Sequence, residues 1–421
     1  MGDSDGVLTL RASTLRTGSI SMDPASLYAS PNALAPSYSR FGVGERLLLT
    51  GHSHQAWPDC GLEGQTQAWL DAARYVDDKW DHALAQADRV REGFAGLLGD
   101  TTGSIALGAN THELVVRLLS ALPLRSRPRL VTTDGEFHSI RRQLDRLEEE
   151  GLTIVRVPER PLDSLAARLS RAVDDRTALV LVSAVFFDTG RIARRLAEVA
   201  ASCRRHGTRL LVDAYHALNV VPFSLADEGL DDAFVVGGGY KYCQLGEGNC
   251  FLRIPPDGEL RPVITGWYSE FTVLAEQHDA GRVAYGRGGD RFAGATYDPT
   301  SHYRAVAVLD FFRRHGLTPQ FLREVSQHQI GVLASTFDQL EVDPAVVSRD
   351  RDSPLTEIGG FLALRSPVAS GLVRSLRARG VWADARGETL RLGPAPYLAD
   401  RQLRDAMGLL AEAVREVSPA S

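Results

Sequence analysis

A lysine and an aspartate each follow a strongly apolar segment of this 421-residue sequence. Lys241 comes after AFVVGGGY, and desolvation of a lysine at a buried strand end favours the neutral amine, a nucleophile that can form a Schiff base. A surface lysine just past a strand explains the position equally well. Asp213 ends TRLLVDA, where a carboxylate needs a cationic partner such as a protonated ring nitrogen. Taken alone, Asp213 is better explained as a helix N-cap.

Polar or aromatic residues stand where five successive apolar segments end. They are Asn110 and Thr111, Phe137 and His138, Asp188 and Thr189, Asp213 and His216, and Tyr240 and Lys241. The free N–H groups of a helix start, with a hydroxyl, suit a phosphate at Asn110 and Thr111, although simple capping selects the same residue types. Phe137 is placed either to stack on a flat ring or to fill the core.

Arg391 lies in TLRLGPAPY, just before a Gly-Pro turn. A planar guanidinium at a strand end suits bidentate recognition of a substrate carboxylate. A surface ion pair is the alternative. Each of these signals is modest by itself, and their order and spacing together favour one anionic, ring-bearing cofactor and a carboxylate substrate.

The elements that position these residues alternate between short apolar runs and amphipathic helices. The runs are near-continuously apolar, which is typical of parallel strands covered by helices on both faces. Strands are expected at residues 104–109, 129–133, 153–158, 177–187, 208–214, 233–241 and 249–255, the last one antiparallel. Helices are expected at residues 65–98 with a break, 111–122, 138–150, 163–173, 191–206 and 400–417, and from about 301 and 319. In such a sheet, ligands bind beyond the carboxyl ends of the strands.

The fold class is therefore α/β, with a mostly parallel, seven-stranded sheet in a large domain and a smaller α+β domain. We expect an N-terminal arm at residues 1–45, the large domain at 46–300 and the small domain at 301–421, packed with the arm.

Composition excludes several other classes of protein. The charge sum is 47 − 53 = −6 without a basic run, so nucleic-acid binding is not expected. The sequence has no stretch of 18 apolar residues, so no membrane-spanning helix is expected. The N-terminus lacks a secretory pattern, and we therefore expect a cytoplasmic protein. No GxGxxG opens a helix, which disfavours a dehydrogenase. His52 and His54 lack a third ligand, so no metal site is expected.

Five motifs carry a resemblance to a known family: VDAYHA around Asp213 and His216, GGGYKY around Lys241, TGW ending at Trp267, RFAGAT ending at Thr296, and RGVWADARGETLRLGPAP around Arg391. From about Leu48 onward the chain resembles the fold-type I enzymes that use pyridoxal 5′-phosphate (PLP), in the class V aminotransferase group. Within that group it is most similar to the kynureninase-like branch.

The resemblance implies a role for each matching residue. Lys241 would form the Schiff base with PLP, and Asp213 would keep the pyridine nitrogen protonated. The remaining PLP-binding residues would be Asn110, Thr111, Phe137, Asp188, His216, Tyr240, Trp267 and Thr296. Trp267 and Thr296 would reach the phosphate of a partner subunit, because the family places its sites at a homodimer interface. The substrate would meet Arg391, His52, Ser53, His54 and Tyr268.

The expected reaction proceeds through an α-carbanion of an amino-acid substrate. Kynureninase-like hydrolysis of a carbon–carbon bond is the leading expectation, with class V transamination and β-elimination of the cysteine or selenocysteine lyase type as alternatives. Desulfurases use a cysteine on a late loop, and no cysteine follows Cys250 here. A catalytically silent regulator with the same fold is the non-enzyme alternative, which intact Lys241, Asp213 and Arg391 disfavour.

Overall fold

A computed structural model describes residues 22–256, 260–276 and 281–417. The N-terminal arm expected at residues 1–45 therefore lies partly outside the described residues. In the described part of the chain, no helix is long and apolar enough to cross a membrane.

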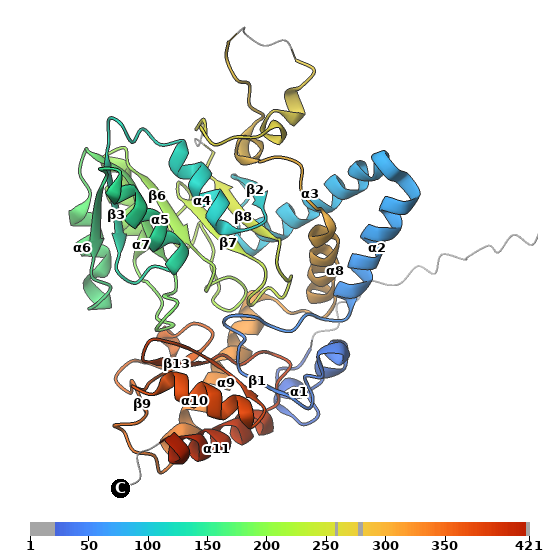
Figure 1. Ribbon diagram of the computed structural model, residues 1–421, viewed down its shortest axis with the longest axis vertical. Coiled ribbons are helices and arrows are strands. Elements are labelled where there is room, and N and C mark those ends of the chain that lie inside the picture. The colour runs from blue at the N-terminus through green and yellow to red at the C-terminus, as the bar shows by residue number, and fades with distance from the viewer. Residues whose placement is uncertain (1–21, 257–259, 277–280, 418–421) are drawn as a thin grey trace, which may run out of the picture.

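The centre of the large domain is a seven-stranded sheet, in the order β2-β8-β7-β6-β5-β3-β4 (Figure 1). The strands are β2 (Ser104–Gly108), β3 (Arg129–Thr133), β4 (Thr153–Val157), β5 (Thr177–Ser183), β6 (Arg209–Asp213), β7 (Phe234–Gly238) and β8 (Cys250–Ile254). Strand β8 runs antiparallel to both of its neighbours, whereas the other described pairings of this sheet are parallel. The mostly parallel sheet predicted from the apolar runs is confirmed.

Helices cover both faces of this sheet because successive strand residues point to opposite sides. On β5, Leu179 and Leu181 pack into one apolar cluster, whereas Val180 and Val182 pack into the other. The first face is covered by α4 (Thr111–Ser120) and α5 (His138–Glu149), and the second by α3 (Lys79–Leu98), α6 (Leu165–Ala172) and α7 (Leu196–Arg205). With both faces buried, the strands carry no alternating polar residues.

The helix expected at residues 191–206 begins only at Leu196, so its predicted start is wrong. Arg191 and Ile192 instead form β-bridges to Ile358 and Val185. Arg195 then adopts a left-handed conformation with φ of 63°. Tertiary pairing with the second domain overrides the helical propensity of this segment.

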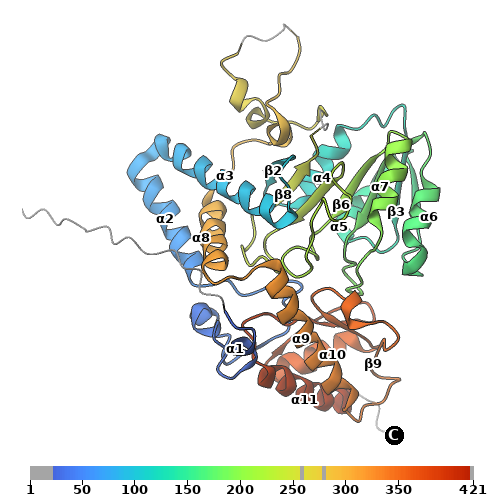
Figure 2. The same ribbon diagram turned by 180° about the vertical axis from the view of Figure 1, so that it is seen from behind.

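The long helical pattern before the sheet folds as two helices. α2 (Cys60–Tyr75) ends at a short 3₁₀ turn, Val76–Asp78, and α3 follows directly. Val76 has φ of 54°, and this left-handed residue forms the break that the sequence predicts. α8 (Thr300–Arg314) packs against both helices, and Figure 2 shows the three together beside the sheet.

The smaller domain combines α9 (Pro319–Asp338), α10 (Ala369–Ala378) and α11 (Asp400–Val417) with a four-stranded sheet. The strand order is β12-β13-β10-β9, from Asp384–Arg386, Thr389–Leu392, Leu362–Arg365 and Ser348–Arg349. A separate parallel pair joins β1 (Leu47–Leu48) to β11 (Val381–Trp382). Figure 1 shows this domain below the large sheet, with α1 (Ala25–Tyr28) beside it.

The described part of the arm contacts the small domain. Asn32 donates a hydrogen bond to the carbonyl of Pro396 at 2.9 Å, and Tyr38 packs its ring 4.8 Å from that of Tyr397. Since β1 also pairs with β11, we propose that the arm and β1 move with the small domain. We further propose that the small domain begins after α8, which packs with the large one.

A buried ion pair fixes β8, the antiparallel strand that carries Cys250. Arg253 is fully buried, and its Nε donates to Asp100 Oδ2 at 2.7 Å. Its Nη1 donates to the carbonyls of Asp231 and Ala233. We expect Asp100→Asn to lower the free energy of unfolding by about 3–5 kcal/mol, because it leaves a buried guanidinium without its counter-charge. Urea unfolding followed by circular dichroism measures the loss.

The Asp100–Arg253 pair should also make the stability of the fold fall at low pH. Burial alone would raise the pKa of Asp100, but Arg253 and the amides of Gly103 and Thr102 lower it to about 2. The pair's contribution is present above the unfolded pKa of about 4 and is lost as the pH falls towards 2. Equal acid sensitivity of wild type and Asp100→Asn between pH 5 and 2 would contradict this account.

Candidate active site

Lys241 lies just beyond the end of β7, buried at 6% exposure. Its Nζ is 2.6 Å from His216 Nε2 and lies over the Tyr215 ring, 4.7 Å from the centroid. Glycine is required at Gly238 because a Cβ there would collide with the Tyr215 hydroxyl and the Cys250 sulfur. The three glycines before Lys241 thus let β7 approach its neighbours closely enough to bury the lysine.

Burial, the largest influence, lowers the pKa of Lys241 to about 7, while Asp213 opposes this shift and Arg391 reinforces it. Burial likewise holds the pKa of His216 well below its usual range, with Lys241 and Arg391 acting in the same direction. His216 is therefore a neutral imidazole whose Nε2 shares a hydrogen bond with the Lys241 amine. A largely neutral lysine near physiological pH is the state a nucleophilic amine needs.

Asp213 is the last residue of β6 and is also buried. Its Oδ1 accepts a hydrogen bond from the Tyr215 amide at 2.8 Å. Burial raises the pKa of Asp213, against the effects of that amide and of Lys241. A carboxylate in this environment is stabilised by a further cationic partner, which a protonated ring nitrogen in the adjoining cavity would supply.

A cavity of about 540 Å³ opens beside these two residues. Its lining includes Lys241, Asp213, His216 and Tyr240, together with Asn110 and Thr111 at the start of α4. The Asn110 side chain caps this helix by accepting from the Glu113 amide at 2.9 Å. The free N–H groups of the first turn therefore border the cavity, as an anion site requires.

Aromatic rings form one wall of this cavity. Phe137 is half-buried, and its ring lies 5.5 Å from Lys241 Nζ and 5.4 Å from the Phe187 ring, to which it is perpendicular. Both rings line the cavity. The structure therefore brings a ring face close to the lysine, which is the arrangement expected of a residue that stacks on a planar cofactor.

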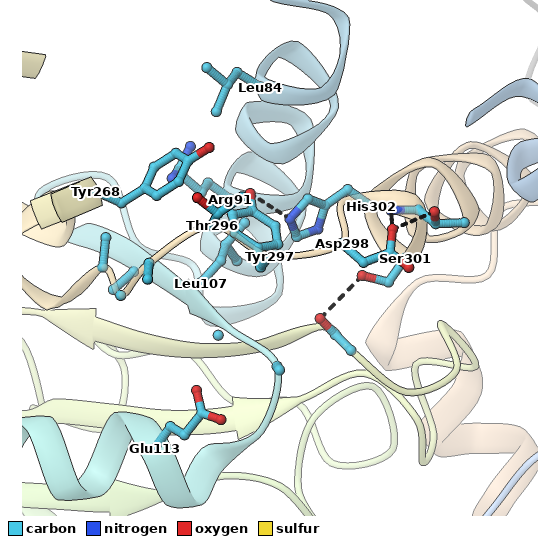
Figure 3. Close-up of a pocket in the computed structure, with 18 of the residues that line it drawn as sticks. Leu84, Arg91, Leu107, Glu113, Tyr268, Thr296, Tyr297, Asp298, Ser301 and His302 are labelled. Carbon is cyan, nitrogen blue, oxygen red and sulfur yellow. Dashed lines mark hydrogen bonds between the residues drawn. The ribbon is translucent and has the colours of Figure 1, made fainter. Parts of the chain in front are cut away.

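A second cavity of about 750 Å³ adjoins the first and shares Ala109, Glu247 and Gly248 with it. Figure 3 shows this second cavity, with Tyr268 and Thr296 among its labelled residues. Tyr268 and Thr296 line this second cavity, and Trp267 Nε1 donates to Thr296 Oγ1 at 3.1 Å. Trp267 is 47% exposed. The structure thus groups these three residues with each other and apart from Lys241 in the same subunit.

Three neighbouring residues, His52, Ser53 and His54, lie in the segment at residues 51–57 and contact different partners. His52 is fully buried and its Nε2 lies 2.7 Å from Asp384 Oδ1. His54 is exposed, stacks on the Tyr240 ring at 4.9 Å between centroids and lies 3.6 Å from Glu247. Ser53 donates to the carbonyl of Thr50. Over the described ranges, no three His, Cys, Asp or Glu side chains are placed to hold a metal ion.

Arg391 and Asp188 lie behind the aromatic wall and do not line either cavity. Arg391 Nη1 donates to the backbone carbonyl of Phe187 at 2.6 Å, and its other side pairs with Asp384. Asp188 accepts from Thr389 Oγ1 at 3.3 Å. A contact between Asp188 and the cofactor therefore stays a prediction.

Sequence reasoning missed two acids near the site, the buried Glu136 and the half-buried Asp384. Glu136 accepts hydrogen bonds from Ser183 Oγ at 2.6 Å and Thr133 Oγ1 at 2.7 Å, and burial raises its pKa to about 7. Asp384 joins His52 to Arg391. Glu136 directly precedes Phe137, and Asp384 stands within the motif around Arg391, so both lay close in sequence to residues already singled out.

Residues 72–265 match the family profile described as aminotransferase class-V. This match spans all seven strands of the large sheet and includes Asp213 and Lys241. The uncharacterized aminotransferase YcbU of Bacillus subtilis (strain 168) is 22% identical over 349 residues, which are 82% of this chain and 88% of that protein. A kynureninase of Xanthomonas oryzae pv. oryzae is 29% identical over 262 residues, 58% of this chain and 57% of that enzyme.

Solved structures show the same fold across both domains. A C-DES mutant, with glycine covalently linked to its PLP cofactor, superimposes with a TM-score of 0.76 at 19% identity, covering 90% of this chain and 98% of that one. Both domains of this chain therefore share their fold with a protein that holds PLP.

The residues present fit PLP, the cofactor of this family. Lys241 lines the cavity with its pKa lowered to about 7, and Asp213 lies buried there, where a cationic ring nitrogen would stabilise its charge. His216 Nδ1 is buried with no hydrogen-bond partner among the described residues. Phe137 and the start of α4 supply a ring face and an anion seat. Each chemical part of PLP therefore has a complementary group.

Proposed function

We propose that this protein is a PLP-dependent enzyme acting on the α-carbon of an amino acid. The observation that carries the proposal is the buried Lys241 amine beside Asp213, Phe137 and the start of α4, all around one cavity. When bound, PLP supplies an electron sink for charge that develops on the substrate.

The residues of this chain divide the work. Lys241 would hold the cofactor covalently and then, once free, move a proton at the substrate α-carbon through Nζ. His216, with Nε2 2.6 Å from that amine, orients it. Asp213 would hold a proton on the cofactor ring, and Asn110, Thr111 and Tyr240 would seat the phosphate. Arg391 would bind the substrate carboxylate.

For the reaction itself we propose kynureninase-like hydrolysis of a carbon–carbon bond. Phe137 is the residue expected to stack on the cofactor ring, and kynureninases are among the relatives. Transamination is the second candidate, and the longer match to YcbU favours it. Thiol chemistry of the desulfurase type is disfavoured, because burial raises the pKa of Cys243 and of Cys250 to about 12.

A screen of amino acids tests this proposal. The purified holoenzyme is expected to be yellow, and each candidate is scored by the change it makes in the visible band. Release of anthranilate from L-kynurenine would support hydrolysis, whereas turnover that depends on an added keto acid would support transamination. A protein that takes up no PLP would overturn the proposed function altogether.

We further propose that the enzyme is a homodimer. Large apolar side chains are exposed on α2, with Trp69 at 78% and Leu70 at 54%, and on the segment before α8, with Val263 at 81%. Trp267 and Thr296 lie on that same segment. In a dimer built on these surfaces, Thr296 would complete the phosphate seat of the partner subunit.

Mixing two defective proteins checks the shared site. Lys241→Ala and Thr296→Ala homodimers are each expected to have low activity, because one lacks the amine and the other a phosphate donor. Hybrids should regain activity, because one of their two sites would carry both intact residues. Up to about a quarter of wild-type specific activity is expected after subunit exchange. Mixtures no more active than the average of the separate proteins would contradict a shared site.

A further inference from the structure

Arg391, the residue expected to bind the substrate carboxylate, is held on several sides by its own chain. It is 3% exposed on β13, and Asp384 stands directly opposite on the antiparallel strand β12. Asp384 Oδ1 accepts from Arg391 Nε at 2.9 Å, and Oδ2 accepts from Nη2. This is a bidentate pair across two strands, which fixes the plane of the guanidinium.

His52 holds the carboxylate of that pair from the other side. Its Nε2 lies 2.7 Å from Asp384 Oδ1. Burial, the largest influence, lowers the pKa of His52 to about 4, so the ring is neutral near physiological pH. An ionised carboxylate only accepts hydrogen bonds, so the proton is on Nε2.

The His52 ring has little freedom to move. It is fully buried, lies 4.8 Å from the Phe361 ring between centroids, and packs so closely on Gly393 that a Cβ there would collide with it. Asp384 keeps its charge here. Burial would raise its pKa, but His52 and Arg391 together hold that pKa below its usual range. The carboxylate is thus anchored by one fixed ring and one fixed cation.

Some N–H groups of the Arg391 guanidinium remain available to a ligand. A guanidinium carries five N–H bonds. Asp384 takes one from Nε and one from Nη2, and the carbonyl of Phe187 takes one from Nη1 at 2.6 Å. One N–H is left on each terminal nitrogen, which is enough for one carboxylate. Phe187 lines the cavity of Lys241, so its contact holds the guanidinium against the cavity wall.

We propose that Asp384, anchored by His52, is a positioning residue that orients Arg391 so that its two remaining N–H groups read the α-carboxylate of the substrate. Asp384 cancels the charge of Arg391, so recognition depends on directed hydrogen bonds rather than on net positive charge. The inference rests on the proposed function, since it concerns the amino-acid substrate.

Asp384→Asn tests the contacts among His52, Asp384 and Arg391, which we call the clamp, with little change in side-chain volume. An amide presents one acceptor atom instead of two, so it cannot hold both guanidinium nitrogens and His52. The probes are L-alanine and L-alaninamide, and L-kynurenine and its amide, titrated into the holoenzyme and followed by the visible band. Wild type should bind each acid more tightly than its amide. In Asp384→Asn this preference should fall by roughly 10–100-fold, with affinity for the amide unchanged within about threefold.

Arg386→Gln is the matched control for charge. Arg386 Nη2 lies 3.6 Å from Asp384 Oδ2, but the side chain is 42% exposed and outside the clamp. This variant also changes the local charge by one unit, in the opposite direction to Asp384→Asn, and should keep the preference for acids. A far-UV spectrum and thermal unfolding confirm that both variants fold.

Three results would overturn the inference. One is an Asp384→Asn holoenzyme that keeps the wild-type preference for acid over amide. Another is equal weakening of acid and amide, which indicates general damage to the pocket. The third is a wild-type holoenzyme that ignores the carboxylate, which also removes the role proposed for Arg391. Failure of wild type to take up PLP is a separate result, and it overturns the proposed function instead.

Discussion

Lys241→Ala is expected to remove the covalent bond to the cofactor and to lower turnover by at least about 10³-fold. The physical reason is that the buried Lys241 amine is both the covalent attachment point and the proton carrier beside the cavity. Reduction with borohydride followed by intact mass spectrometry measures attachment. Wild type should gain the mass of one reduced cofactor, and Lys241→Ala should gain none.

The small number of lysines in the chain makes the labelling easy to assign to one residue. The sequence has only two lysines, Lys79 and Lys241. Lys79 is the first residue of α3 and is partly exposed, so Lys79→Ala is the matched control and should label like wild type. Label on Lys241→Ala equal to that on wild type would contradict the assignment.

Attachment should also depend on pH in a defined direction. Only the neutral amine attacks a carbonyl carbon, and the pKa of Lys241 is lowered to about 7. The rate at which apo-protein takes up PLP should therefore rise with pH through about 7 and level off above 8. An exposed lysine of ordinary pKa would still be gaining reactivity at pH 10.

Asp213→Asn is expected to lower turnover by roughly 10²–10⁴-fold while leaving the fold intact. An asparagine has no negative charge with which to keep a proton on the cofactor ring. The effect on turnover and the effect on stability should separate, because burial already raises the pKa of Asp213. Removing this charge relieves a desolvation cost, so the apo-variant should unfold at the same temperature as wild type or higher.

Steady-state turnover and thermal unfolding of apo- and holo-proteins measure these effects. Asp232→Asn, which alters an exposed pair with Arg204, is the control and should change neither quantity. A large drop in the unfolding temperature of apo Asp213→Asn would show a structural role instead. Activity within tenfold of wild type would show that the ring proton does not depend on Asp213.

The sequence alone determined the sheet and the residues at its carboxyl edge. Asp213 and Lys241 could be placed together because parallel strands all end at one edge, so residues that follow successive apolar runs converge there. Asn110 could be placed at a helix start because its side chain accepts from the amide three residues on, a local contact. Such features depend on local pattern, which a single sequence records.

Only the tertiary structure decided the partners of the remaining polar groups. His52 meets Asp384 across 332 residues of chain, so the HxH pattern gave no indication that the two histidines diverge. Arg391 was expected to face the substrate, yet its partner across β12 and β13 occupies part of the guanidinium. Trp267 donates a hydrogen bond to Thr296, which lines the second cavity. These contacts follow from how two domains pack, and hydrogen-bond partners so far apart leave no periodicity in the sequence.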